Sequence, residues 1–434
     1  MTRKITAFNN FLRQRRRALR IDNTTDPRDR RGRRYAWRSL FAANLIGMML
    51  CARSLRTLEE LNQDFGALAR GFSVPAKVGR WALGNFLRRA KTSVLLDKLH
   101  ELMRYEVRSK SLAPSGLPFG VVAVDGKQDR RKLSERFTDF VQWVRPDGSK
   151  PYGLHRVLRV ALVSSSVPVV LTCMEVLGKT NEAASFKELF ESLVSLFGSV
   201  FQLVTGDAAF CTAANAALVR AANYAYLFGL KENQPALFEE ARRVLIPEAR
   251  SRVADALDPG WETDSRGRTI RRFLWVTHDM AGWHGWEHLT QVFLVRTLEQ
   301  LDDGTTSILD ERLFVTNMTR GMLTAKRALL VIRRHWRIEN CVFGTLDRKD
   351  LWAEDTTQGW SYTGNGLANT SILTCIAFNL LSLFRGVHLR SQANRRAKWL
   401  RVLRWLVFVF YLPAAAFRAD AAIEQAEQEC PLPA

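Results

Sequence analysis

The sequence lacks several features that would place it in common protein classes. Its six cysteines include no CxxC pair, a usage that indicates reduced thiols in a cytoplasmic protein. No GxxxxGK[ST] loop is present, so the sequence does not support ATP-dependent chemistry. The Arg-rich N-terminus has no apolar segment behind it, so we expect no signal peptide. The apolar run 405–417 is interrupted by Pro413 and is too short to cross a bilayer, so a buried helix and no membrane partner are expected.

Acidic residues are also scarce relative to basic ones. The 434-residue chain has 64 Lys and Arg against 43 Asp and Glu, a formal net charge of +21. Residues 1–38 hold 13 Lys and Arg against 3 Asp, and residues 385–404 hold 7 and no acid. A solvated surface or a membrane-binding surface would account for part of this excess. Nucleic acid is the partner that it favours most.

The arrangement of apolar residues predicts a helical N-terminal part followed by an α/β part. Helical patterns run from about Trp37 to Leu61 and from about Lys77 to Leu102. Strands and helices then alternate, with predicted strands at 119–125, a hairpin at 156–177, and further strands at 201–207 and 224–230. Helices are predicted at 180–198 and 211–223. This order indicates an α/β fold with a mixed sheet flanked by helices.

The α/β pattern is interrupted between about Leu237 and Leu313. The segments "WETDSRGRTIRRFLWVTHD" and "EHLTQVFLVRTLEQ" are typical of antiparallel strands with polar turns. We therefore expect a β-rich insertion in the α/β domain. A strand and a long helix follow the insertion, and two apolar helices come later in the chain.

Three carboxylates occupy positions where apolar side chains would be expected. Asp125 ends the run "GVVAVD", and Asp207 ends "FQLVTGD". Glu339 follows Ile332, His335 and Trp336 by seven, four and three residues, so the four share one helix face. Carboxylates on core-facing positions are costly unless positive charge neutralises them, and a divalent cation does this well. Asp207 could instead cap a helix, and Glu339 could be an ordinary solvated carboxylate. Glu354 and Asp355 are rivals for the position of the third acid.

Such a set suits metal-assisted cleavage of a phosphodiester. Two Mg²⁺ ions, with Mn²⁺ as the alternative, activate the attacking oxygen and stabilise the leaving oxygen. Mg²⁺ prefers hard oxygen ligands and keeps several waters, so two or three carboxylates suffice to hold the ions. Basic residues near the first and third acids are expected to contact the nucleic-acid backbone; they are Lys127, Arg130, Arg131, Lys132, Arg333, Arg334 and Arg337, with His335 as a further candidate.

The motifs "VDGK", "TGDA", "LKENQ", "RRHWRIEN" and "AEDTT…TGN", in this order, resemble the DDE transposases of bacterial insertion sequences. The resemblance is to the ISAs1-like group, which is related to the IS4-type transposases, and it covers residues 21–385. It implies an RNase H-like core whose metal-binding and catalytic residues are Asp125, Asp207 and Glu339. It also implies that Lys231 and Gln234 of "LKENQ" contact DNA.

Together with the sequence pattern, this resemblance predicts five parts of the chain. They are a basic helical DNA-binding module (1–105), the first part of the core (106–236), the β-rich insertion (237–312), the second part of the core with the catalytic Glu helix (313–390), and a basic C-terminal helix and tail (391–434).

The resemblance implies a transposase that cleaves the ends of an insertion sequence and transfers its 3′-hydroxyl strands into target DNA. Its DNA partners would be terminal inverted repeats and the target, in the bacterial cytoplasm at the nucleoid. A homodimer is expected because the reaction joins two ends. Two alternatives stay open, namely an RNase H-like nuclease without strand transfer and a catalytically silent DNA-binding protein derived from a transposase.

Overall fold

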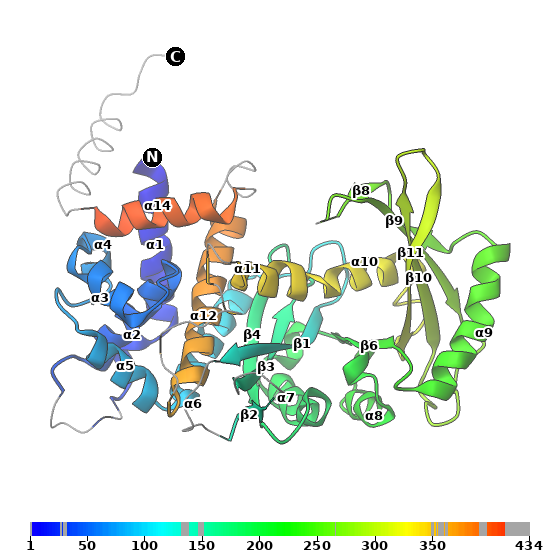
Figure 1. Cartoon of the computed structure of the whole chain (residues 1–434), viewed down its shortest axis with the longest axis horizontal. Coiled ribbons are helices and arrows are strands. Elements are labelled where there is room, and N and C mark those ends of the chain that lie inside the picture. The colour runs from blue at the N-terminus through cyan, green and yellow to red at the C-terminus, as the bar shows by residue number, and fades with distance from the viewer. Residues whose placement is uncertain are drawn as a thin grey trace, which may run out of the picture.

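The structure is a computed structural model with three regions along its long axis (Figure 1). Helices from both ends of the chain gather at one end, a mixed sheet lies in the middle, and the insertion forms the other end. The described residues are 2–26, 28, 33–131, 139–145, 152–264, 266–348, 351–352, 354, 360, 363–389 and 397–412, with side chains described for all of these except 2–5 and 129–131.

The middle of the sheet has the strand order and directions of an RNase H-like core. The order is β4-β3-β1-β5-β6. β1 (Val121–Arg131) pairs antiparallel with β3 (Tyr152–Leu162), which pairs antiparallel with β4 (Val169–Val176) and with the short β2 (Val141–Val144). On its other side β1 runs parallel to β5 (Leu203–Gly206), and β5 runs parallel to β6 (Ala225–Leu230). The predicted mixed sheet and the hairpin at 156–177 are confirmed.

The start of β1 is a central strand. Val121 through Val124 are all at most 1% exposed, because a strand with neighbours on both sides and helices on both faces has no solvent-facing side chains. The prediction that the strand ends at Asp125 is wrong, since β1 continues to Arg131 against β3. Only the parallel pairing with β5 stops, at Val124 and Gly206.

Helices cover both faces of this core. α7 (Glu182–Phe197) and α8 (Ala213–Ala221) connect the parallel strands and pack on one face, where they contact each other. Asn181 and Thr212 cap these helices through their side chains. α10 (Ala325–His335) lies over the other face and contacts β1.

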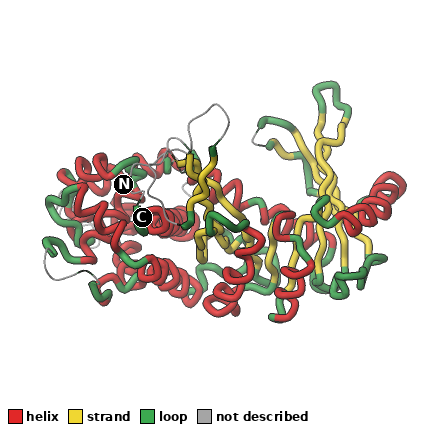
Figure 2. Tube along the Cα trace, turned by 60° about the horizontal axis from the view of Figure 1, so that its bottom comes forward, coloured by secondary structure: helices red, strands yellow, loops and turns green. Residues whose placement is uncertain are grey.

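The insertion extends the same sheet. β9 (Thr269–Thr277) and β10 (Gln291–Gln300) pair antiparallel, as predicted. β11 (Thr306–Thr316) pairs antiparallel with β10, and β7 (Ala256–Leu257) and β8 (Glu262–Thr263) pair with β9. β11 also pairs antiparallel with β6, so a single sheet of 11 strands runs through both regions. Figure 2 shows these long strands rising away from the helices.

The insertion differs from the prediction in two details. A helix that the sequence pattern did not predict, α9 (Pro235–Ser251), opens it and packs on β9 and β10. β11 crosses the expected boundary at residue 313, because its first half pairs only within the insertion and its second half also pairs with β6.

The N-terminal region is helical, but its two predicted long helices are each divided. The first becomes α2 (Trp37–Met49) and α3 (Leu55–Gln63), since Cys51 has a φ of 55° and Ser54 caps the new helix by accepting from the Thr57 amide. The second becomes α5 (Arg80–Arg89) and α6 (Thr92–Arg108), with extended backbone at Ala90 and Lys91 between them.

Several shorter elements and the C-terminal helices complete the chain. They are α1 (Thr2–Ala18), η1 (Ile21–Asn23), α4 (Ala67–Gly71), η2 (Gly198–Val200), η3 (Ala208–Phe210), the π-helix η4 (Ile338–Phe343), α11 (Gly344–Leu346), α12 (Gly366–Leu383), the π-helix η5 (Phe384–His388) and α14 (Trp399–Tyr411). The predicted apolar helix at 405–417 corresponds to the end of α14, and residues 413–417 lie outside the described residues.

The Arg-rich N-terminus forms a packed helix, which excludes a solvated tail for this segment. Phe8, Phe11 and Leu12 of α1 are buried. Arg15 is 2% exposed, lies 4.2 Å from the Phe11 ring centre, and donates from Nε to Glu106 at 2.9 Å. α1 thereby joins α6 to the C-terminal region.

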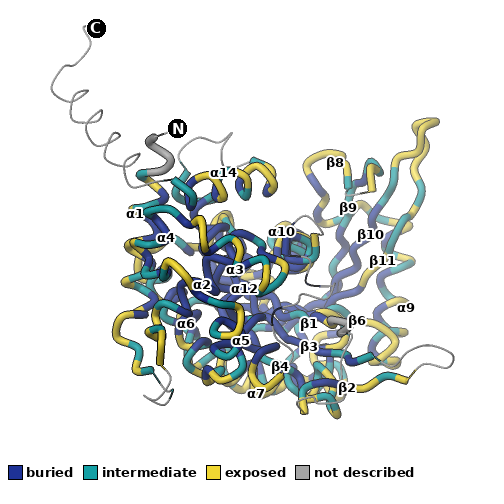
Figure 3. Tube along the Cα trace, turned by 60° about the vertical axis from the view of Figure 1, so that its left-hand side comes forward, coloured by how far each residue is buried: buried dark blue, intermediate teal, exposed yellow. Residues whose placement is uncertain are grey.

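α12 is the central helix of the helical region, where it contacts α2, α5 and α6. Within the described part of the chain, the segment Gly366–His388 is the one helix long and apolar enough to cross a membrane. Its most apolar window is 94% buried inside the protein (Figure 3), as expected for a core helix.

Candidate active site

The sheet register brings Asp125 and Asp207 side by side. Val124 and Gly206 are the last paired residues of parallel strands β1 and β5. The next residues on the two strands are Asp125 and Asp207, and neighbouring strands lie about 4.8 Å apart. Their side chains leave the same edge of the core, 82 positions apart in the chain.

Glu339 reaches this edge from above the sheet. α10 ends at His335, and the chain continues in helical conformation into the π-helix η4, which carries Glu339. π-helical turns occur frequently at functional sites because they change the direction of one side chain within a helix. His335, Trp336 and Glu339 line one cavity of about 630 Å³ together with Asp207. The helix face predicted from the sequence spacing is therefore present, although a single α-helix does not form it.

The pKa of all three carboxyl groups is raised. Partial burial, followed by the negative charges of Glu339 and Asp207, raises the pKa of Asp125 to about 8, against one hydrogen bond from the Gly126 amide at 2.8 Å. Removal from water within the concave cavity also raises the pKa of Asp207, where the Ala209 amide and Lys231 oppose the shift. The pKa of Glu339 is raised by the same desolvation and by Asp207, with Arg312 opposing.

The donor set fits divalent cations. Among the described residues, no Lys, Arg or His forms an ion pair with Asp125, Asp207 or Glu339. The three groups repel one another and share hard oxygen ligands, which is the environment that Mg²⁺ or Mn²⁺ would stabilise. In the part of the chain that the structure describes, no three such side chains are close enough to hold a metal as they stand. A bound cation would therefore draw them together.

Asp207 also caps a helix, as the competing interpretation of this residue predicted. It therefore has both features, a cap and a place in the candidate site. Its Oδ1 accepts from the Ala209 amide at 3.0 Å at the start of η3. Asn233 of the "LKENQ" motif holds the same turn, because its Nδ2 donates to the carbonyls of Ala208 and Cys211. The sequence analysis did not assign this function to Asn233, whose position within the "LKENQ" motif was the only signal.

A fourth carboxylate, which the sequence analysis did not select, lies at this edge. Glu182 is the first residue of α7, and its pKa is raised by partial burial and by the charge of Asp207, with Arg156 opposing. Its charge also contributes to the raised pKa of Asp125. Its place at a helix N-terminus resembles an ordinary first-turn acid, so the sequence alone gave no reason to group it with the three acids.

The basic residues predicted to contact DNA fall into two groups. Lys231 is exposed, lines the cavity and lowers the pKa of Asp207, so its ammonium group is available to a phosphate. Gln234 follows it as the N-cap residue of α9 and makes no capping hydrogen bond with its side chain. Arg312 of β11 lines the same cavity and lies 4.5 Å from the Trp336 ring centre; sequence reasoning missed it because it lies in the insertion.

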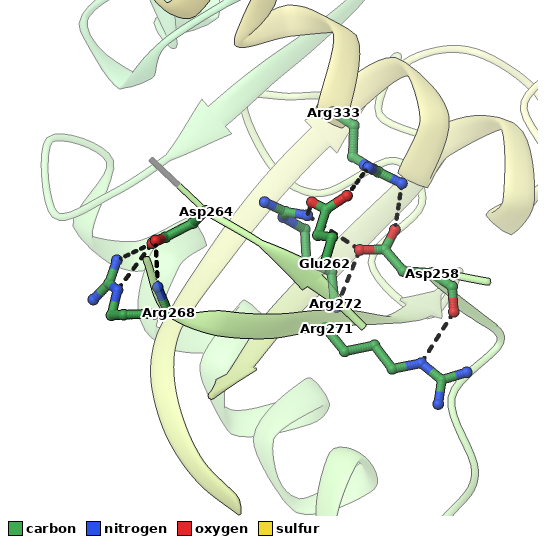
Figure 4. A network of polar contacts seen from close by, with 7 residues as sticks. All are labelled: Asp258, Glu262, Asp264, Arg268, Arg271, Arg272 and Arg333. Carbon is green, nitrogen blue, oxygen red and sulfur yellow. Dashed lines mark hydrogen bonds and ion pairs between the residues drawn. The ribbon is translucent and has the colours of Figure 1, made fainter. Parts of the chain in front are cut away.

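Arg333 instead joins α10 to the insertion (Figure 4). Its guanidinium donates to Asp258 Oδ1 at 2.9 Å and to Glu262 Oε2 at 2.5 Å. Arg272 of β9 pairs with the same two acids. The Asp258 side chain is only 2% exposed. This network, which we call the insertion clamp (Asp258, Glu262, Arg272 and Arg333), fixes the helix that leads to Glu339 against β7, β8 and β9.

The neighbouring arginines are also engaged within the protein. Arg334 donates to the Ser164 carbonyl at 2.9 Å and to that of Ser115. Arg337 donates to the carbonyls of residues 163, 165 and 166. These contacts hold α10 and η4 on the loop between β3 and β4. DNA contact by Arg333, Arg334 and Arg337 stays a prediction, and it would have to compete with these bonds.

The side chains of His335 and Lys127 also form contacts within the protein. His335 is 4% exposed, and burial, with Arg312 adding to it, lowers its pKa to about 4, so the ring is neutral at pH 7. Its Nδ1 lies 2.9 Å from the hydroxyl of Thr205 on β5, so it supports the sheet rather than supplying positive charge. Lys127 forms an ion pair with Asp347, which follows η4 in the chain. The side chains of Arg130 and Arg131, and the whole of Lys132, lie outside the described residues.

Glu354, a rival for the third acid, forms a buried ion pair. Glu354 is 4% exposed, and both of its oxygens accept from Arg159, at 2.8 and 2.9 Å. Arg159 is the residue of β3 directly opposite Asp125, so the cationic side chain opposite the first acid is already paired with Glu354. Asp355, the other rival, lies outside the described residues.

Comparison with known proteins concerns the family of the chain. No curated protein sequence matches the chain. One similar solved structure is the cryo-EM structure of a piggyBac transposase synaptic complex with hairpin DNA, 10% identical, covering 95% of this chain and 78% of that chain with a TM-score of 0.41.

The family comparison is more informative. The family model described as "Transposase DDE domain" matches residues 117–380. The match begins just before β1 and ends within α12, so it includes both core aspartates, the insertion and Glu339. The chain belongs to the transposase DDE domain family.

Proposed function

We propose that this chain is the DNA transposase of a bacterial insertion sequence, of the ISAs1-like group, and that Asp125, Asp207 and Glu339 are its catalytic carboxylates. The observation that carries the proposal is their convergence. Asp125 and Asp207 adjoin in the sheet register, and Glu339 lines the same cavity as Asp207 and raises the pKa of Asp125. The family match supports transposition of DNA as the reaction.

The residues have separable functions in this proposal. The three carboxylates would hold two Mg²⁺ or Mn²⁺ ions, which would supply the charge that activates the attacking oxygen and stabilises the leaving oxygen. Lys231 and Arg312 line the cavity wall, and they would contact phosphates next to the cleaved bond. His335 stays neutral and holds β5 in place through Thr205.

The same residues would serve two successive reactions. Water first cleaves a strand at each element end, and the freed 3′-hydroxyl then attacks target DNA. Two chains would pair the two ends as a homodimer at the nucleoid. The basic N-terminal helices would bind the terminal inverted repeats. Gln234 and the arginines around Glu339 are further candidates for DNA contact.

The experiment that tests this proposal uses the full-length protein, Mg²⁺ and DNA that carries the inverted repeats flanking the reading frame. Cleavage at the repeat ends, followed by joining of pre-cut ends to a supercoiled plasmid, is expected. D125N, D207N and E339Q should bind the repeats and fail in both steps, while E191Q, an exposed acid on α7, should behave as wild type.

The two alternatives predict different products in the same assay. A nuclease without strand transfer would nick the plasmid in Mg²⁺ and never give joined products. A catalytically silent DNA-binding protein would bind the repeats without cleaving them, and the three substitutions would change nothing measurable. Both outcomes would contradict the proposed strand transfer.

A further inference from the structure

Glu182 approaches the candidate active site from the face of the sheet opposite Glu339. Neighbouring residues on a strand point to opposite faces, so Asp125 and Gly126 face different layers. Asp125 shares its face of the sheet with Arg159, which is opposite it in the register. The Arg159 guanidinium lies 5.5 Å from the ring centre of Phe343, so this is the face that η4 covers. The side of Gly126 is the one covered by α7, and there the carboxylate of Glu182 lies directly against the backbone of Gly126.

This close approach depends on glycine at position 126. A Cβ added there would lie 2.1 Å from the carboxyl carbon of Glu182 and 2.2 and 2.3 Å from its two oxygens. Gly126 has no positive φ, so the backbone does not require a glycine. The space that the missing Cβ leaves is instead filled by a carboxylate, next to the residue that carries the first acid.

The position of Glu182 is fixed from both ends of its segment. Asn181 caps α7 by accepting from the Ala184 amide at 2.9 Å, which sets Glu182 in the first helical turn. Arg156 of β3 donates to the carbonyls of residues 178 and 180 just before the helix. Among the described residues Glu182 forms no ion pair, and its charge acts on both Asp125 and Asp207.

We propose that Glu182 is a positioning residue of the cation site, which adds a fourth negative charge beneath Asp125 and Asp207 and strengthens the binding of divalent cations there. The inference rests on the proposed metal-dependent function. Without a bound cation, a fourth carboxylate at this edge would only add to the repulsion among the other three. With a bound cation, its charge would instead add to the attraction.

The experiment measures Mn²⁺ binding to the full-length protein without DNA, by isothermal titration calorimetry and by the electron paramagnetic resonance signal of free Mn²⁺. E182Q keeps the shape of the side chain and removes its charge, and we expect the Kd of Mn²⁺ to rise by about tenfold, as for other outer partners of metal ligands. E191Q, on the exposed side of the same helix, is the matched control and should leave the Kd unchanged.

G126A provides a second, independent variant. The three heavy atoms nearest to the added methyl group all belong to the end of the flexible Glu182 side chain, so the protein should fold, yet the carboxylate of Glu182 must move away. We expect G126A to weaken Mn²⁺ binding to a similar degree as E182Q, and the double variant G126A/E182Q to be no weaker than either one. A merely structural glycine would instead lower the melting temperature without changing the Kd.

Two outcomes separate this inference from the proposed function. If D125N and D207N lose Mn²⁺ binding while E182Q has the same Kd as E191Q, the inference about Glu182 is overturned and the proposed cation site is supported. If D125N and D207N bind Mn²⁺ as wild type does, the cation site itself is overturned, and this inference with it.

Discussion

Two acidic clusters in this molecule face opposite electrostatic situations. In the insertion clamp, Asp258 and Glu262 each pair with both Arg272 and Arg333. At the edge of the core, Asp125, Asp207 and Glu339 have no such partners among the described residues, and the pKa of each is raised. The clamp neutralises itself and joins two regions. The core cluster lacks such cationic partners, so its carboxylates repel one another and the pKa of each is raised, and this is the physical basis for proposing cation-dependent chemistry there.

The largest expected effect is on catalysis. D207N removes a charge from the core cluster, and we expect the rate of Mg²⁺-dependent strand cleavage to fall by roughly 10³-fold or more, equivalent to about 4 kcal/mol of barrier. The rate is measured on repeat-end DNA in single-turnover conditions. D258N, in the clamp, should lower that rate far less. Equal losses for the two variants would remove the distinction between the clusters.

The clamp should show its effect in stability instead. D258N leaves Arg272 and Arg333 with only Glu262, and breaking a buried ion pair of this kind costs about 3 kcal/mol. We expect the free energy of unfolding in urea to fall by this amount. E240Q, which breaks an exposed pair with Arg243 on α9, is the control and should show no measurable change. A clamp variant as stable as the wild type would contradict the structural function of this network.

Added metal should stabilise one cluster only. A cation that binds the folded state alone raises the free energy of unfolding by about 2.7 kcal/mol at a hundredfold excess over its Kd. We expect Mn²⁺ to raise the melting temperature of the wild type and of D258N, each relative to its own metal-free form. D125N should show no such increase. Stabilisation of D125N by Mn²⁺ would place the metal elsewhere.

A further prediction concerns pH. The pKa of Asp125 is raised from 3.8 to about 8 in the folded, metal-free protein, so between these values the folded state holds a proton that the unfolded state has released. The contribution of Asp125 to the free energy of unfolding is therefore largest at low pH and is lost as the pH rises to about 8. D125N should gain stability relative to the wild type as the pH increases over this range. Melting curves without metal at pH 5, 6.5 and 8 test this, and an opposite trend would contradict the raised pKa.

The sequence predicted most of the core because its strands are short apolar runs separated by capped helices. The resemblance grouped Asp125 with Asp207, and the register brings them to neighbouring strands. β1 nevertheless continues beyond Asp125, since hairpin pairing with β3 needs no apolar side chains. The division of the N-terminal helices was missed, because the break at Cys51 lies in a turn without glycine or proline.

The charged residues were harder to predict from sequence. Arg333, Arg334 and Arg337 cluster around Glu339 as DNA contacts would, yet their partners are an acid pair about 70 residues away and carbonyls at least 170 residues away. Such partners depend on tertiary packing, which leaves no local signal. Glu182 was missed for the same reason, because only the sheet places α7 beneath Gly126.

The most direct test of the central claim is the location of Mn²⁺ in crystals of the full-length protein soaked in MnCl₂, determined from the anomalous signal of the metal. We predict Mn²⁺ bound by oxygens of Asp125, Asp207 and Glu339, with none at Asp258 and Glu262. Crystals in which Glu339 points away from the two aspartates, with no metal among the three, would contradict the account.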